Sequence, residues 1–193
     1  MKLFFKKGIS IFVLFTIALS LISCSSSKPE DSVTNFFEAL KKSDLNEAST
    51  YTKKDGDNGK FKYDDENQEK LMKSIFSKTE CKIQSTEKSK DTATISAKIT
   101  AADLTKIYAN MVKDLLPTLM TQAFANQSND DKSQDAMMNQ YLVNSVNDPK
   151  AAMTTTDVKI KLVKENGTWL IEPNDDLLNA MTGNLKSVID SMK

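Results

Sequence analysis

Few side chains in this sequence could act as nucleophiles or general bases, because histidine and arginine are both absent. Without histidine there is no Ser-His or Cys-His pair and no His-containing zinc site. Without arginine there is no guanidinium fork for bidentate binding of phosphate or carboxylate. No two carboxylates pair at an interpretable position on an apolar face. We therefore predict a protein that is not an enzyme, with no catalytic residues, no metal and no cofactor.

One polar segment, DGDNGKFKYDDE, partly matches a calcium-binding loop. Asp55, Asp57 and Glu66 stand at the first, third and twelfth ligand positions of such a loop. The fifth position is Gly59, which offers no side-chain oxygen, and the sixth is Lys60 where the loop needs glycine. The pattern favours a solvated loop between helices.

The two cysteines, Cys24 and Cys81, lie in different contexts. Cys24 ends an apolar run and precedes serines, whereas Cys81 alternates with polar residues beside Ile83. A disulfide between a flexible Ser-rich stretch and a strand face is disfavoured. We interpret Cys81 as a small buried hydrophobic side chain, because a reactive thiol needs a positive, exposed environment.

The first 23 residues have the parts of a secretory signal peptide: early lysines, an apolar middle and small residues at the end. As a helix, the apolar residues 8–22 span only about 22 Å, at ~1.5 Å per residue. The hydrocarbon core of a bilayer is ~30 Å thick, so a permanent spanning helix is disfavoured.

The end of this segment, Leu21-Ile22-Ser23-Cys24, resembles the lipobox of bacterial lipoproteins. The resemblance implies a signal peptide 1–23 cleaved between Ser23 and Cys24, a diacylglyceryl group on the Cys24 thiol, and a lipidated tether over 24–28. Each buried CH₂ contributes ~0.8 kcal/mol, so two or three acyl chains hold a protein on a membrane. We expect a lipid anchor in the cell membrane, on its outer, extracytoplasmic face. An ordinary signal peptide or a signal anchor is the alternative.

The charge pattern argues against nucleic acid as a partner. The chain holds 26 basic and 26 acidic residues. Lys2, Lys6 and Lys7 lie in the signal segment, so the remainder has an excess of three acids. It also has no basic stripe, and binding to nucleic acid depends on clustered lysine and arginine.

Periodicity predicts the elements of residues 29–193, which we assign to one domain. Apolar spacings of three and four predict short helices over 29–42, 44–51 and 70–76, the first with a capping box starting at Ser27. Alternation then predicts strands 81–86, with Cys81, Ile83 and Ser85 on the buried face, and 93–99. A helical insertion at about 103–153 follows, and further strands at 157–163 and 168–171 flank the turn signal Asn166-Gly167. The final predicted helix starts after Pro173-Asn174 and has an apolar stripe formed by Leu177, Leu178, Met181, Leu185, Val188, Ile189 and Met192.

This order predicts the α+β class: a curved antiparallel sheet of two hairpins packed on N-terminal helices, with a helical insertion between the hairpins and a C-terminal helix. Two stretches, PEDSVTNFFEALKKSDLNEASTYT and KLVKENGTWLI, resemble nuclear transport factor 2-like (cystatin-like) lipoproteins of Gram-positive bacteria. The resemblance implies a cone-shaped fold with a cavity between sheet and helices. The helices over 103–153 and the final helix depart from the small members of that superfamily.

The inserted helices carry the most adaptable apolar side chains, because methionine is flexible and suits variable contacts. We predict a non-catalytic binding module for a small apolar or peptide ligand, in a cavity beside these helices. The alternative is a structural or interaction lipoprotein that contacts an envelope protein through the insertion. The other reading of the methionines is core packing, which is the more common role of methionine at helical spacing. The candidate residues for either surface are Met111, Leu115, Met120, Phe124, Met137 and Tyr141.

Overall fold

The structure is a computed structural model that describes residues 27–54, 66–124 and 131–185. Its helices and strands follow one another in the order α2 (Pro29–Lys41), α3 (Leu45–Ser49), α4 (Glu66–Ser77), β1 (Glu80–Lys88), β2 (Thr92–Ala102), α5 (Leu104–Phe124), α6 (Asp131–Asn147), β3 (Met153–Glu165), β4 (Thr168–Ile171) and α7 (Asp175–Met181). Cys24 and the signal segment, nearly all of the calcium-like segment, and Val188, Ile189 and Met192 lie outside the described residues.

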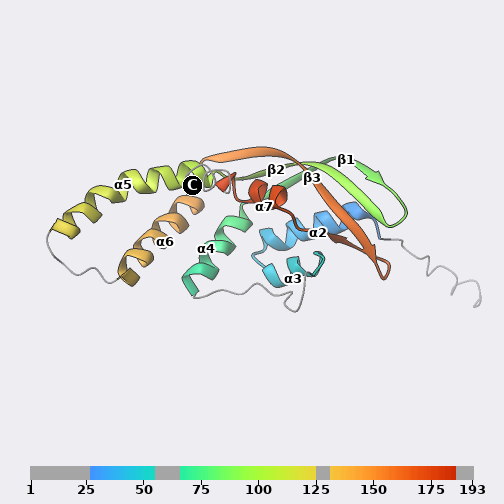
Figure 1. The fold of residues 1–193 in the computed structure, drawn as a ribbon, viewed down its shortest axis with the longest axis horizontal. Coiled ribbons are helices and arrows are strands. Elements are labelled where there is room, and N and C mark those ends of the chain that lie inside the picture. Colours follow the sequence, from blue (N-terminus) through green and yellow to red (C-terminus); the bar gives the residue numbers. More distant parts are fainter. Residues whose placement is uncertain (1–26, 55–65, 125–130, 186–193) are drawn as a thin grey trace, which may run out of the picture.

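The four strands form one antiparallel sheet in the order β1-β2-β3-β4 (Figure 1). Each hairpin is local, whereas β2 and β3 pair across the whole helical insertion, from Thr92↔Val163 to Ala102↔Met153. The predicted α+β class, with two hairpins, helices between them and a C-terminal helix, is confirmed.

One face of the sheet forms the core against the helices. Alternate residues of β2 and β3 are fully or almost fully buried, and their neighbours on the other face remain accessible. Helix α2 packs across β1, β2 and β4, and it places Val33, Phe36, Phe37 and Leu40 in the same core. Trp169 of β4 is completely buried and is therefore a core aromatic.

The local signals for turns and caps are mostly confirmed. Asn166 and Gly167 have φ angles of 48° and 85°, as a type I′ turn requires. The Asp44 carboxylate accepts a hydrogen bond from the Glu47 amide (2.8 Å) at the start of α3. Asn174 does the same for the Leu177 amide (2.8 Å) at α7.

The first cap is wrong by one residue. Helix α2 begins at Pro29, and its N-cap is Lys28 rather than Ser27. The Lys28 amide donates to the Asp31 carboxylate (3.3 Å), so the reciprocal partner is Asp31. The Ser27 hydroxyl instead donates to the carbonyl of Gly167, 140 residues away (2.8 Å).

The strand pattern of β1 also departs from the prediction. A register irregularity between Ile83 and Ser85 shifts the pairing by one residue, so that Thr86 rather than Ser85 lies opposite the buried Ile95. Ser85 is exposed. Beyond a bulge of this kind, side chains that would have faced the core face solvent, and the reverse. A prediction that assumes strict alternation along the strand therefore assigns the wrong face to the residues after the bulge.

Several of the predicted helices and strands are shorter than those in the structure. Helix α4 begins at Glu66 rather than residue 70, β2 extends to Ala102 rather than residue 99, and β3 begins at Met153 rather than residue 157. Within the described residues, no helix is both long enough and apolar enough to cross a bilayer.

Candidate functional site

The inserted helices α5 and α6 form a pair at one end of the molecule (Figure 1). The first turn of α5 is fixed by Asp103, whose carboxylate accepts from the Lys106 amide (3.1 Å). The Asp103 amide donates to the carbonyl of Ala152 (2.8 Å), so the insertion leaves and re-enters the sheet at neighbouring points. Helix α5 continues away from the strands, and α6 returns beside it to pack on α4.

One face of α5 packs inward. Leu104 and Ile107 belong to the main core, while Met111 is buried outside it. Further along, Leu115 and Leu119 are half-buried. Because these buried side chains lie in the first turns of α5, the N-terminal part of the helix packs against the rest of the molecule.

The adjacent face of α5 is apolar and exposed. Five side chains at four-residue intervals are accessible, with exposed fractions that rise toward the end of the helix: Tyr108 40%, Val112 44%, Leu116 49%, Met120 49% and Phe124 81%. Residues four apart form a continuous ridge on a helix, slightly inclined to its axis. We call these five residues the α5 ridge.

Helix α6 supplies the packing that supports α5. Val143 and Val146 are buried, whereas Met137 and Tyr141 are half-buried. The Tyr141 hydroxyl donates to the Asp114 carboxylate of α5 (2.6 Å), and this bond raises the pKa of Tyr141 above its ordinary value. The two helices are therefore tied together at mid-length.

The six candidate residues of the insertion divide between two roles. Met111 is buried, Leu115 is half-buried, and Met137 and Tyr141 lie on the supporting helix. Met120 and Phe124 belong to the α5 ridge. The other ridge residues are Tyr108, Val112 and Leu116. A helical pattern alone does not show which apolar face of α5 a second helix covers.

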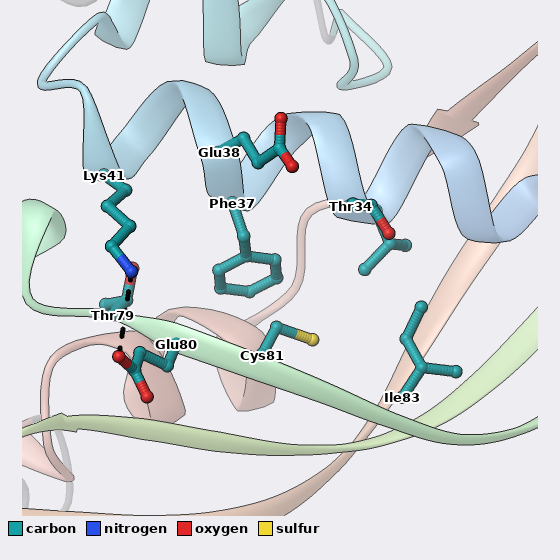
Figure 2. A pocket seen from close by; sticks show the side chains of 9 residues that line it. Thr34, Phe37, Glu38, Lys41, Thr79, Glu80, Cys81 and Ile83 are labelled. Atoms are coloured by element: carbon teal, nitrogen blue, oxygen red, sulfur yellow. Dashed lines mark ion pairs between the residues drawn. The ribbon is translucent and has the colours of Figure 1, made fainter.

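Among the clefts lined by described residues, three are well formed, and the linings of these three include none of the six candidate residues. The first, of about 310 Å³, lies between α2 and the edge strand β1. Figure 2 shows Phe37 and Ile83 pointing into it from opposite sides, with the Cys81 thiol between them. An ion pair from Lys41 to Glu80 (3.9 Å) crosses one end. Burial raises the pKa of Cys81 to about 11, so its thiol is protonated at neutral pH.

The other two clefts differ in character. One, of about 520 Å³, lies between α4 and the end of α6 and is lined by charged and polar side chains. The other, of about 340 Å³, lies between α2, α4 and α7, and is lined largely by Phe36, Phe76, Leu177, Leu178 and Met181. We call this third cleft the α7 cleft.

The described residues contain no group of three or more Cys, Asp or Glu side chains arranged to hold a metal ion. Their ion pairs are mostly exposed or half-exposed, such as Lys53 to Glu172 (3.2 Å) and Lys98 to Asp157 (3.1 Å). Pairs of this kind contribute little to stability. The candidate sites in the described residues are therefore the exposed apolar face of α5 and the clefts.

Comparison with protein-family models and with curated protein sequences finds no match. Comparison with solved structures finds a similarity to a candidate lipoprotein, YcdA, of Bacillus subtilis. The TM-score is 0.46 at 17% sequence identity, over 80% of this chain and 47% of that one. The matched part thus covers about half of that protein.

Proposed function

We propose that the protein is a lipoprotein anchored through Cys24 to the outer face of the cell membrane, with no catalytic activity, and that it binds an envelope protein through the α5 ridge. The lipobox-like segment ending at Cys24 supports the anchor. The exposure of five apolar side chains in one row supports the binding surface. Contiguous exposed apolar surface of this kind marks interaction sites in folded proteins.

The spacing of the side chains in the α5 ridge indicates what kind of surface a partner would present. A row of side chains at i, i+4 spacing fits the groove between equivalent rows on a second helix. We therefore propose that the partner presents an amphipathic helix with an apolar face. Lys106, Lys113 and Asp114 on the same helix are exposed and supply both signs of charge at the margin.

The anchor is tested with the variant Cys24→Ser. We expect the variant to lose incorporation of labelled palmitate and to leave the membrane fraction or accumulate as precursor. Unchanged labelling would overturn the proposed lipidation. The matched control is Cys81→Ser, which should retain both labelling and membrane association.

The binding surface is tested by placing a photo-crosslinking amino acid at Leu116 in growing cells, with Lys159 on the accessible face of the sheet as the control position. We expect one discrete adduct from Leu116, none from Lys159, and loss of the adduct when Val112→Glu is added. An adduct with the mass of two copies of this chain would identify self-association and contradict an envelope partner. Equal labelling at both positions would contradict the ridge as a specific surface.

A second candidate function rests on the α7 cleft. Its volume of about 340 Å³ lies within the range of small-molecule sites, ~300–1,000 Å³. The cleft is bordered by the half-exposed Leu178, and it lies among the helices rather than beside the insertion. We propose it as the alternative position for a small apolar or peptide ligand, in keeping with the cavity that the nuclear transport factor 2-like resemblance implies.

The ligand alternative is tested by mass spectrometry of compounds that co-purify with the protein. Leu178→Trp narrows the cleft from its mouth and should reduce the recovered ligand, whereas Leu116→Trp on the α5 ridge should not. Protein that purifies without any bound compound, and that fails to bind a fluorescent fatty acid, would contradict this alternative and leave the α5 ridge as the binding surface.

A further inference from the structure

We propose that the end of the sheet carrying the two hairpin turns rests on the lipid headgroups, and that the α5–α6 pair points away from the membrane. This inference rests on the proposed lipidation of Cys24 and adds an orientation to it. It follows from the hydrogen bond that fixes Ser27 beside the β3–β4 turn and from how the elements are placed along the molecule.

The lipid can lie only a short distance from the folded domain. Ser27 follows Cys24 by three positions. An extended chain covers at most ~3.6 Å per residue, so the two residues can be at most about 11 Å apart. Ser27 is held in place, because its hydroxyl donates to the Gly167 carbonyl (2.8 Å). The anchor is therefore confined to the neighbourhood of the β3–β4 turn.

Both hairpin turns lie at this same end of the sheet. The amide of Lys164, next to the β3–β4 turn, donates to the carbonyl of Asp91 in the β1–β2 turn (2.9 Å). The ammonium groups of Lys88 and Lys164 lie 5.4 and 5.8 Å from the centre of the Trp169 ring. A bilayer that approaches one turn therefore meets the other as well.

The surface of this end suits headgroups rather than acyl chains. The exposed residues of the two turns are polar: Lys88, Ser89, Lys90, Asp91, Glu165, Asn166, Gly167 and Thr168. The large exposed apolar side chains of the described chain all lie elsewhere. The turns carry similar numbers of basic and acidic groups, so we expect the acyl anchor, and not attraction to anionic lipid, to provide the binding.

The α5 ridge lies toward the opposite end. Strand β2 runs away from the turn for 11 residues, and α5 continues beyond it for 21 residues (Figure 1). At ~3.3 Å per strand residue and ~1.5 Å per helix residue, Phe124 lies on the order of 60 Å from the membrane-facing turns. The ridge is thus presented to a partner that stands well outside the bilayer.

The orientation is tested by energy transfer from tryptophan to dansyl-labelled headgroups. The chain from Cys24 onward, with Cys81→Ser, is coupled through Cys24 to maleimide lipid in phosphatidylcholine vesicles. Trp169 is the only tryptophan of the chain and lies beside the β3–β4 turn. We expect strong transfer from Trp169, and almost none from a tryptophan introduced as Phe124→Trp together with Trp169→Phe.

Two further measurements control for the folding of the variant and for the charge of the lipid. Phe124→Trp in the presence of Trp169 should add emission without adding transfer, which removes any dependence on the folding of Trp169→Phe. Replacing part of the phosphatidylcholine by phosphatidylglycerol should not change the transfer. Equal transfer from positions 124 and 169 would overturn the orientation. Because the coupling is chemical, this result is independent of the palmitate experiment, which decides whether cells lipidate Cys24.

Discussion

Gly183, just beyond α7, packs directly against the carbonyl group of Ala102 at the end of β2. A Cβ atom on residue 183 would overlap that carbonyl, and the φ angle of Gly183 is +58°, in the left-handed region. Only glycine satisfies both conditions without displacing the backbone. The contact joins the C-terminal helix to the point where the insertion begins.

We predict that Gly183→Ala lowers the free energy of unfolding by about 3 kcal/mol, since both the overlap and the left-handed φ angle are penalised. The measurement is urea unfolding followed by circular dichroism. Gly167→Ala is the matched control: its φ angle is +85°, but nothing lies within 4 Å of the added Cβ. The control should lose only about 1 kcal/mol, from the conformational penalty alone. Equal losses would show that the packing against Ala102 is unimportant.

The two faces of α5 should respond differently to truncation. Met111 is 3% exposed, and Met→Ala in a core lowers stability by about 2–5 kcal/mol. Leu116 is 49% exposed, so we predict that Leu116→Ala changes stability by about 0.5 kcal/mol or less. Thermal unfolding of both variants checks this. A large loss in Leu116→Ala would mean that the α5 ridge is covered within the folded protein.

The Tyr141–Asp114 hydrogen bond predicts a pH dependence of stability at high pH. The bond to the Asp114 carboxylate raises the pKa of Tyr141 above its ordinary value of 10.0. A raised pKa in the folded state stabilises the protein below pH 10, and this contribution is lost as the pH rises through the raised value. Asp114→Asn should lower the pKa of Tyr141, as measured by the ultraviolet absorbance of the ionised phenol, with Tyr141→Phe to assign the step. An unchanged titration in Asp114→Asn would contradict the contact.

Glu30 of α2 predicts a pH dependence of stability at low pH, because its pKa is lowered rather than raised. A hydrogen bond with the Thr86 side chain of β1 is the largest cause that lowers the pKa of Glu30 below its ordinary value of 4.5. This contribution is present above pH 4.5 and is lost as the pH falls through the lowered value. Thr86→Val should therefore be less stable than the parent at pH 6, and the difference should shrink under strongly acidic conditions. A difference that does not vary with pH would assign the effect to packing alone.

The predictable parts of this fold were those determined by neighbours in sequence. Asp44, Asn174 and the pair Asn166-Gly167 act on residues one to three positions away, so their spacing was sufficient to place two caps and a turn. Ser27 was misread because its hydroxyl bonds to the carbonyl of Gly167, which is distant in sequence.

The features of the candidate site that depend on contacts distant in sequence could not be predicted either. The sequence predicts a helical insertion with apolar candidate residues, but the division of α5 into a buried and an exposed face depends on where α6 packs. The face assignment of Ser85 failed because a bulge is invisible to a period-two pattern. Such contacts depend on the tertiary arrangement, and no local propensity encodes them.

The pairing of β2 with β3 has a consequence for the order of folding. Each hairpin closes a turn of a few residues, but Ala102 and Met153 can meet only after the 50 residues between them are brought back on themselves. Closing so long a loop has a greater entropic cost than closing either hairpin. Because α5 and α6 run out and return as a compact pair, their formation brings the two strand ends together. The segment proposed to bind a partner would then also assemble the two halves of the sheet.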